Sequence, residues 1–386
     1  MESSLIEHAA ELRDAIDGLA QLRDEVGVLS ITVGIEPGPV LGERPAWEVA
    51  LENDLARLAR NGARGRAVER WLAGANGELE RLVDAARSGR GRALYVALGT
   101  GASTELCLQP PLPTGARLGD LAHVLPLLAA LDAGEPAAFL VASRDELALH
   151  ESELGTVHEL DRIELEPWVG SWWPEMKAPA RANPLRGQEM VSHRDRYARR
   201  VAAAYRRTLD EAVREVVARA GERGWTRAVL AGDPRRTEPL EEALREAGVA
   251  TVVLDATLAG VPEEDARRRL RTALEGLVAS RALELAREAK AEAAADGRGA
   301  CGLADVLAAL GEGRVARLLI DPARVFPGTV GPGEVLRAAV PPEEGVDLTD
   351  RIVARALATD AAVTPLSGEA AAVLQDREGI GALLRW

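Results

Sequence analysis

The sequence predicts an α/β protein built from three consecutive α/β domains. Its 386 residues are enough for two or three compact units, each with its own core. Segments with strand-type alternation and segments with helical periodicity succeed one another along the chain. Two breaks, Gly134-Glu135-Pro136 and Asp296–Gly299, interrupt this series. We therefore place the domains at residues 1–133, 134–262 and 263–386.

The composition is that of a globular protein. Apolar residues make up 47% of the chain and charged residues 28%, which excludes a mostly disordered protein. We expect a cytoplasmic protein, because no apolar stretch approaches the ~18 residues of a membrane-spanning helix and no signal segment is recognisable. Cys107 and Cys301 are the only cysteines, too few for a disulfide framework or a four-cysteine zinc site. We expect both to be buried as small apolar residues.

The first domain is predicted to combine helices with a β-hairpin. Its expected elements are a helix at 4–24, a strand at 28–35, helices at 47–59 and 67–86, strands at 94–98 and 104–108, and a helix that ends near Leu131. The last two strands flank Gly99-Thr100-Gly101-Ala102-Ser103, whose glycines can adopt positive φ, as hairpin turns require. No Gly-Lys-Ser/Thr follows this turn, so we do not expect a phosphate-binding loop.

The second domain is predicted to contain antiparallel strands, a long basic loop, and then a β-α-β unit. The expected elements are strands at 137–142, 147–151 and 156–160, a loop at 164–190, a helix that opens near Tyr197, a strand at 227–231, a helix at 238–247 and a strand at 250–254. Asp233, before Pro234, is expected to cap the following turn. We expect Trp168, Trp172 and Trp173 to anchor the loop, with stacking on RNA bases as the alternative.

The third domain is predicted to be a long charged helix followed by a small α/β/α sandwich. The charged linker helix spans residues 263–295. After it, we expect a helix at 303–310, a strand at 315–320, a helix at 348–357, a strand at 362–366, a helix at 368–375 and a strand within 380–386. This order of elements predicts helices on both faces of one sheet.

Basic residues gather in one window of the second domain. Residues 177–207 hold nine basic residues and two acids, so the remainder of this chain of net charge −14 carries −21. A basic patch on an acidic body is typical of proteins that bind a polyanion. Helical spacing of the apolar residues in this window leaves four arginines to the sides and to solvent: Arg199, Arg200, Arg206 and Arg207. The alternative for each arginine is a solvated charge or a structural ion pair.

Three segments of the chain carry a resemblance. They are Gly187-Gln188 with the later Tyr197-Ala198-Arg199-Arg200-Val201, the stretch 301–320, and the terminus Gly379-Ile380-Gly381-Ala382-Leu383-Leu384-Arg385-Trp386. Together they resemble the archaeal and eukaryotic peptide chain release factors and Pelota, including their bacterial branch of release-factor-like peptidyl-tRNA hydrolases and Balon-type hibernation factors. The first segment resembles the family's Gly-Gly-Gln loop and the helix behind it. Order and spacing agree over roughly residues 137–386.

The resemblance implies a function on the ribosome. In that family the loop enters the peptidyl transferase centre and promotes attack of water on the ester that joins the peptide to tRNA. The resemblance implies that Gln188 and Gly187 are catalytic, and that the RNA-binding residues are Arg186, Arg194, Arg196, Arg199 and Arg200. It implies the large-subunit rRNA and tRNA as partners, with a translational GTPase as a further one. We expect no cofactor, no metal, no DNA and no membrane.

The sequence also departs from the family. Arg186 replaces the first glycine, and the spacing from Gln188 to Tyr197 is shorter by about two helical turns. The first domain has no Asn-Ile-Lys-Ser signature, so we do not expect stop-codon recognition. Other catalytic classes lack support, because the chain has no Gly-x-Ser-x-Gly elbow and no His-x-x-x-His pair.

Three functions stay open from the sequence. The first is peptidyl-tRNA hydrolysis on stalled ribosomes. The second is a non-enzymatic hibernation factor that occupies the A site, in which Gln188 is incidental. The third is a binding module that contacts proteins through its acidic surface.

Overall fold

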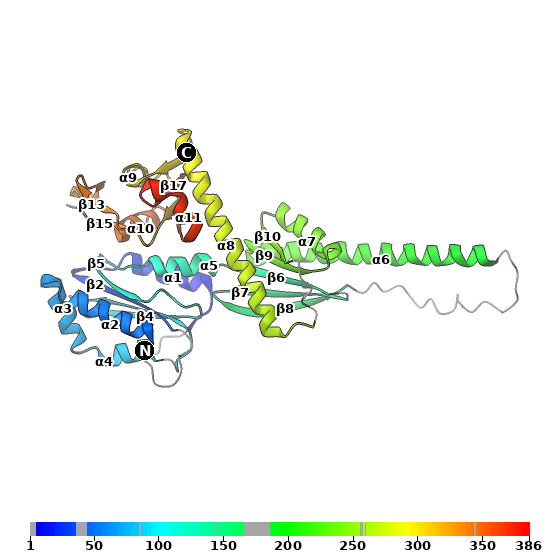
Figure 1. Cartoon of the computed structure of the whole chain (residues 1–386), viewed down its shortest axis with the longest axis horizontal. Coiled ribbons are helices and arrows are strands. Elements are labelled where there is room, and N and C mark those ends of the chain that lie inside the picture. The colour runs from blue at the N-terminus through cyan, green and yellow to red at the C-terminus, as the bar shows by residue number, and fades with distance from the viewer. Residues whose placement is uncertain are drawn as a thin grey trace. The chain divides into compact units, whose positions relative to one another are not determined.

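The computed structural model describes residues 5–35, 45–84, 86–143, 145–165, 186–254, 258, 260–342 and 345–386. Over these residues the chain is a mixed α/β protein with several sheets, which confirms the fold class (Figure 1). The contacts divide it into two compact units: unit 1 is Met1–Glu135, Glu153–Thr156 and Val278–Trp386, and unit 2 is Pro136–Ser152 and Val157–Leu277. The three domain boundaries stay a prediction. No helix in the described part of the chain is both long and apolar enough to cross a membrane.

Unit 1 contains a five-stranded sheet with helices on both faces. Its strands lie in the order β1 (Leu5–Ile6), β4 (Ser103–Leu108), β3 (Gly91–Ala97), β2 (Arg23–Gly34) and β5 (Gly115–Leu121). On one face, Leu94 and Val96 share a core with α2 (Ala46–Ala59), α3 (Gly62–Leu72) and α4 (Asn76–Val83). On the other face, Ala93 and Tyr95 pack with α1 (Ala9–Ala20) and α5 (Leu125–Ala133). This alternation is the period-2 pattern of a strand buried on both sides.

The predicted hairpin is confirmed, because β3 and β4 pair antiparallel across the glycine-containing turn. Asp24 holds this turn: its carboxylate accepts hydrogen bonds from the backbone N–H groups of Gly27 and Gly99, both at 3.0 Å. Burial acts to raise the pKa of Asp24, but these backbone donors outweigh burial and lower that pKa.

Two predictions in this region are wrong in detail. The single helix expected at 67–86 is two helices, α3 and α4, because Gly74 and its neighbours form a turn between them. The helix expected at 4–24 is shorter, since β1 precedes it and β2 already begins at Arg23. Strand β5 was not predicted, because its two glycines and Asp120 leave no apolar alternation.

The C-terminal part of unit 1 is a second sheet, also covered on both faces. The strand order is β11 (Gly299–Cys301), β17 (Ile380–Leu384), β12 (Val315–Ile320) and β16 (Ala362–Pro365). Leu318 and Ile320 pack with α9 (Leu303–Gly311) and α10 (Thr349–Leu357). Leu319, on the opposite face, packs with α11 (Gly368–Val373) and the second half of α8 (Glu263–Ala294). Cys301 and Cys107 are buried and free, as expected.

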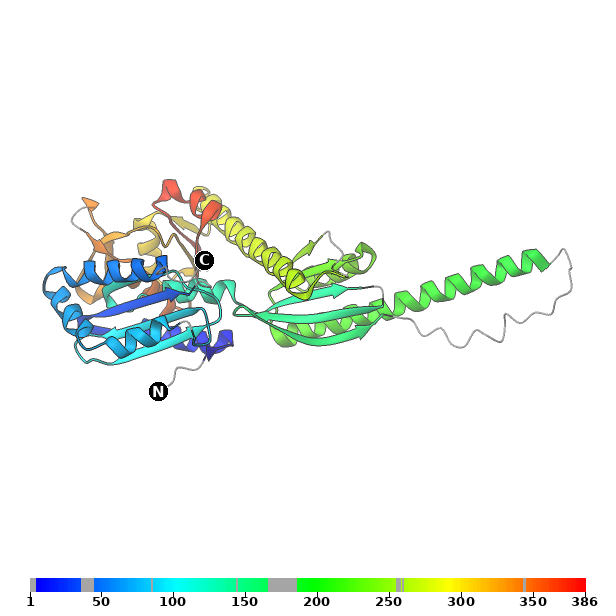
Figure 2. The ribbon, with the colours of Figure 1, turned by 60° about the horizontal axis from the view of Figure 1, so that its bottom comes forward.

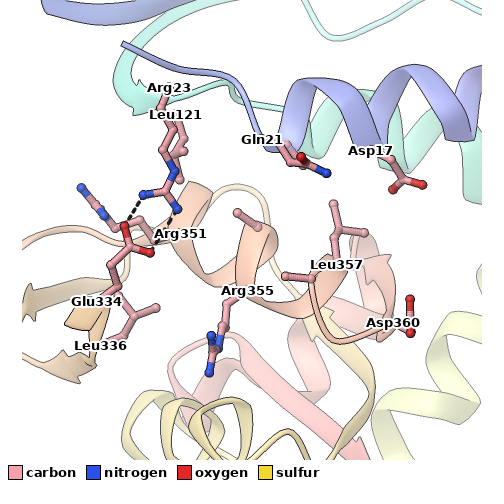
Figure 3. A pocket seen from close by; sticks show the side chains of 13 residues that line it. Asp17, Gln21, Arg23, Leu121, Glu334, Leu336, Arg351, Arg355, Leu357 and Asp360 are labelled. Carbon is pink, nitrogen blue, oxygen red and sulfur yellow. Dashed lines mark hydrogen bonds and ion pairs between the residues drawn. The ribbon is translucent and has the colours of Figure 1, made fainter. Parts of the chain in front are cut away.

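A small sheet is inserted between β12 and α10. Its strands, in the order β14 (Leu336–Ala338), β13 (Pro327–Val330) and β15 (Val346–Asp347), were not predicted because they are short and separated by prolines and glycines. Ion pairs join this region and α10 to the N-terminal sheet: Arg23–Glu334, Arg117–Asp347 and Arg351–Asp120. Figure 3 shows the Arg23–Glu334 pair on the wall of a cavity of about 680 Å³.

Asp347 is predicted to make unit 1 less stable in acid. Burial acts to raise its pKa, but the hydroxyl and N–H of Thr349 and the guanidinium of Arg117 outweigh burial and lower that pKa. A depressed pKa in the folded state gives stability that is present above the unfolded pKa of about 4 and is lost as the pH falls through the folded value. We therefore expect Asp347→Asn to destabilise the protein in urea at pH 7, and this difference to shrink below about pH 4.

Asp14→Asn, at an exposed position of α1, is the matched control and should show no such pH dependence. An equal effect of Asp347→Asn at neutral and acidic pH would show that the charge of this carboxylate does not contribute.

Unit 2 is a five-stranded sheet with helices on both faces. Its strands lie in the order β10 (Ala250–Leu254), β9 (Arg227–Gly232), β6 (Ala137–Ala142), β7 (Glu146–Glu153) and β8 (Thr156–Glu164). Helices α6 (Arg186–Arg223) and α7 (Pro234–Glu246) share a core with Ala138 and Leu140. The first half of α8 packs on Phe139 at the other face. The predicted antiparallel pair β6–β7 and the parallel β9–α7–β10 unit are both confirmed.

The expected cap at Asp233 is confirmed as well. Its side chain accepts a hydrogen bond from the backbone N–H of Arg235 at 3.0 Å, in the first turn of α7. The helix begins at Pro234, four residues earlier than expected, since proline at the first helical position is compatible with the helix.

Candidate functional site

Every residue expected to act in catalysis or RNA binding lies on helix α6. The helix begins at Arg186 and runs for 38 residues, or about 57 Å at the usual rise per residue. The prediction of a loop as far as Met190 is therefore wrong over its last five residues. The physical reason is local: no proline lies between Pro184 and Pro234, and Gln188, Glu189 and Met190 are good helix formers.

The rest of the predicted loop, residues 166–185, lies outside the described residues, and so do Trp168, Trp172 and Trp173. For the first five site residues the structure describes the helical backbone and not the side chains: Arg186, Gly187, Gln188, Arg194 and Arg196. Gly187 and Gln188 are in the first turn. The first four N–H groups of an α-helix have no partner within it, so the N–H groups at these two positions lie at the positive end of a long helix and are not bonded to its own carbonyl groups.

The side chains of Arg199 and Arg200 are exposed, as the helical spacing predicts. They open a ten-residue stretch, 199–208, that contains no acidic residue and no buried side chain. Arg206 and Arg207, in the same stretch, are also exposed. None of these four arginines forms an ion pair with another described residue. The stretch is therefore a set of cations available to an external anion.

The arginines at the other end of α6 are bound within unit 2. Among the side chains of α6 that the structure describes, Leu209 is the first that is buried. Beyond it, Arg219 pairs with Asp161 of β8 and lowers the pKa of that carboxyl. Arg223 pairs with Glu151 of β7 at 3.1 Å. Two classes of arginine therefore share one helix. Arg219 and Arg223 are ion-paired within unit 2, whereas Arg199, Arg200, Arg206 and Arg207 form no ion pair with a described residue.

Glu151 fixes this end of the helix from inside the unit. The carboxylate is 7% exposed and accepts a hydrogen bond of 2.8 Å from the indole N–H of Trp225. A buried carboxylate with two such donors is expensive to disturb. The C-terminal half of α6 is thus held on the sheet by apolar packing, an ion pair and a buried hydrogen bond, and Figures 1 and 2 show its N-terminal half continuing well past the sheet.

Tyr205 contacts α7 where the free and the packed parts of α6 meet. The Nε of Arg236 donates to the Tyr205 hydroxyl at 2.7 Å, and the guanidinium carbon lies 5.7 Å from the centre of the tyrosine ring. Arg236 also lies 3.5 Å from a carboxylate oxygen of Asp233. These contacts connect the base of the free segment to the N-terminal cap of α7.

Sequence reasoning missed Arg206 and Arg207 as site residues. The sequence contained a signal for them, because the ten residues 199–208 include no acid that could pair with an arginine. Arg219 and Arg223, farther along the helix, are ion-paired. Among the described residues, no group of three or more His, Cys, Asp or Glu side chains could hold a metal ion.

The model of bacterial archaeo-eukaryotic release factor family 10 matches residues 123–296, the segment from α5 through α8. No curated protein matches the chain. The chain is similar in fold to the archaeal translation termination factor aRF1, at 17% identity over 99% of each chain with a TM-score of 0.25. It is also similar to Pelota from Archaeoglobus fulgidus, at 16% identity over 97% of this chain and 92% of that chain with a TM-score of 0.33.

A third similar structure is ribosome-bound archaeal Pelota with ABCE1. It is 14% identical over 100% of this chain and 96% of that chain, with a TM-score of 0.40. All three TM-scores are below 0.5, so the assignment rests on the matched segment, which contains the whole of α6. The similarity to the bacterial archaeo-eukaryotic release factor family thus covers residues 123–296, which is less than half of the chain.

Proposed function

We propose that this protein binds stalled ribosomes in the cytoplasm and hydrolyses peptidyl-tRNA there, without reading stop codons. The observation that carries the proposal is the free segment of α6, defined as residues 186–208. The part of it with described side chains, 199–208, presents four exposed arginines with no acid among them. Phosphate contacts of this kind suit rRNA and tRNA, whose backbones carry dense negative charge.

The proposed chemistry is ester hydrolysis. A water oxygen attacks the carbonyl carbon of the peptidyl ester, and the bond from that carbon to the ribose oxygen breaks. A proton from the water passes to the ribose oxygen, so the tRNA leaves with a free hydroxyl and the peptide with a carboxyl group. A glutamine amide is too weak a base to take the proton. Gln188 would instead orient the water, and free backbone N–H groups beside it would stabilise the developing oxyanion.

The position of Gly187 and Gln188 at the start of α6 supports this role. The N-terminus of a helix presents unpaired N–H groups and a partial positive charge to an anion. Gly187 carries no Cβ, so the backbone can approach a substrate closely. Arg186, Arg194, Arg196, Arg199 and Arg200 would contact phosphates around the ester.

A non-enzymatic hibernation factor that occupies the A site is the second candidate. The observation that favours it is the helical backbone at Gly187 and Gln188, because a regular helix makes no use of the left-handed conformations that glycine alone adopts easily. In this case the free segment would fill an idle ribosome without promoting hydrolysis.

The two functions separate in one assay. Purified protein is added to stalled ribosomes that carry radiolabelled peptidyl-tRNA, and released peptide and bound protein are measured together. Release in step with binding is the expected result. Tight binding with no release would assign the hibernation function instead.

Charge reversal in the free segment should weaken ribosome binding. We expect Arg199→Glu with Arg200→Glu to reduce co-sedimentation with ribosomes by about 10-fold or more and to lower the salt dependence of binding by about two counterions. Arg269→Glu with Arg271→Glu, two exposed arginines of α8 in the same unit, changes the net charge equally and should leave binding intact. Equal losses in both variants would mean that binding follows total charge rather than this helix.

A further inference from the structure

A second group of arginines lies on unit 1, where α2 meets α3. We call it the α2–α3 corner and define it as Arg57, Arg60, Arg64, Arg66 and Arg70. All five are exposed, and Glu69 is the only acid between the first and the last of them. Residues 1–133 as a whole hold thirteen basic residues against nineteen acids. The corner is therefore a local positive patch on an acidic region of the chain.

The packing of the two helices brings these arginines together. Gly65 is buried against the last turn of α2: a Cβ added to it would lie 2.5 Å from the carbonyl oxygen of Ala59. Arg64 and Arg66 flank this glycine, and Arg60 follows Ala59 directly. The close approach that only glycine permits thus brings the end of α2, which carries Arg60, next to the part of α3 that carries Arg64 and Arg66.

Two of the five arginines form ion pairs within unit 1, and the other three form none with a described residue. Arg57 pairs with Asp54 at 2.9 Å, and Arg64 pairs with Asp120 at 2.5 Å. Arg60, Arg66 and Arg70 form no ion pair with any described residue. Arg70 donates from Nε to the carbonyl oxygen of Arg66 at 3.3 Å, so these two guanidinium-bearing residues lie one helical turn apart on α3.

Clustered like charges destabilise a helix surface, and none of the described acids forms an ion pair with Arg60, Arg66 or Arg70. An anionic partner would compensate these three charges. Guanidinium groups bind phosphate through paired N–H donors, and arginines one turn apart can contact neighbouring phosphates. A protein partner is less consistent with this surface, because protein interfaces centre on apolar anchors. None of the exposed large apolar side chains in the described part of the chain lies between Arg57 and Leu72.

We propose that the α2–α3 corner binds the phosphate backbone of structured RNA, as a second RNA contact in addition to the free segment of α6. The proposal does not depend on peptide release, because it concerns binding by different residues on the other unit.

The test measures RNA binding by the full-length protein. Fluorescence anisotropy with a fluorescein-labelled RNA hairpin would compare wild type with the variant Arg60→Glu, Arg66→Glu, Arg70→Glu over roughly 50 to 200 mM salt. We expect affinity to fall by about 10- to 100-fold and the slope of log affinity against log salt to fall by about two to three. The loss should recur in the Arg199→Glu, Arg200→Glu background, which separates this contact from that of α6.

Two further variants keep the result interpretable. Arg60→Lys, Arg66→Lys, Arg70→Lys retains the charge and should retain most of the affinity, while showing that the corner tolerates substitution. The control Arg13→Glu, Arg287→Glu, Arg298→Glu changes three exposed arginines elsewhere on unit 1 and should bind like wild type. The proposal would be overturned if the Arg60→Glu, Arg66→Glu, Arg70→Glu variant bound RNA within twofold of wild type in both backgrounds. It would also be overturned if the control variant lost as much RNA affinity. Displacement of the RNA by polyglutamate at equal charge concentration would assign the corner to an acidic protein and overturn it too.

Discussion

Replacing Gln188 with alanine is expected to slow peptide release from stalled ribosomes by about 10²- to 10³-fold, the range seen when a positioned transition-state donor is removed. The proposed role of this amide is to hold a water molecule in line with the ester, and a small misplacement of a reacting group alone costs about 100-fold. Ribosome binding should be unchanged, because the arginines of α6 are intact. Single-turnover release from radiolabelled peptidyl-tRNA, with co-sedimentation in parallel, measures both quantities.

Folding does not confound this variant. Gln188 is in the first turn of α6, and alanine is at least as good a helix former as glutamine. Gln375→Ala, at an exposed glutamine of unit 1, is the matched control and should release peptide at the wild-type rate. Undiminished release by Gln188→Ala would remove Gln188 from the mechanism, and loss of binding in step with release would make it a contact residue.

Gly232→Ala is expected to be the most destabilising single substitution considered for unit 2, by about 2 to 5 kcal/mol. Gly232 ends β9 with φ of +134°, and an added Cβ would lie 2.1 Å from the carbonyl oxygen of Ala142 at the end of the paired strand β6. The positive φ costs roughly 1 to 2 kcal/mol for an L-residue, and the overlap forces the strands apart at roughly 1 to 3 kcal/mol more. Urea unfolding and hydrogen exchange of the β6 and β9 amides would measure the loss.

Two other glycines of unit 2 separate the strain from the overlap. Gly248 has φ of +84° with nothing within 4 Å of an added Cβ, so Gly248→Ala should lose only about 1 to 2 kcal/mol. Gly221, inside α6, is also open, and Gly221→Ala should gain about 0.5 to 1 kcal/mol. If Gly232→Ala and Gly248→Ala lower the free energy of unfolding by the same amount, the overlap with Ala142 does not contribute to the loss.

The sequence predicted best those elements whose pattern is local and strong. The parallel β9–α7–β10 unit and the β3–β4 hairpin follow from apolar strands and turn residues, and the cap at Asp233 follows from its place before a proline. Strand β5 and the small sheet beside α10 could not be predicted in this way. Their strands are held by pairing with neighbours distant in sequence, and their glycines, prolines and charges carry no alternation.

The candidate site was predicted in part. Helical spacing correctly predicted that Arg199 and Arg200 are exposed, because the buried face set by Leu209 and Val216 recurs at helical steps. The start of α6 was not predicted, because residues 164–190 as a whole show little periodicity and contain four prolines, which favours a loop. The α2–α3 corner was also missed, because its meaning depends on Gly65 bringing two helices together, which a linear reading does not show.

The contact between Tyr205 and Arg236 has a mechanical consequence. The part of α6 from Arg186 to Thr208 is about 33 Å long, and the contact of Tyr205 with Arg236 lies near its base. A tilt of about 5° at the base would displace the first turn of the helix by about 3 Å, which is the length of a hydrogen bond. If Gln188 acts as proposed, the Tyr205–Arg236 contact would therefore control how accurately the start of α6 is placed.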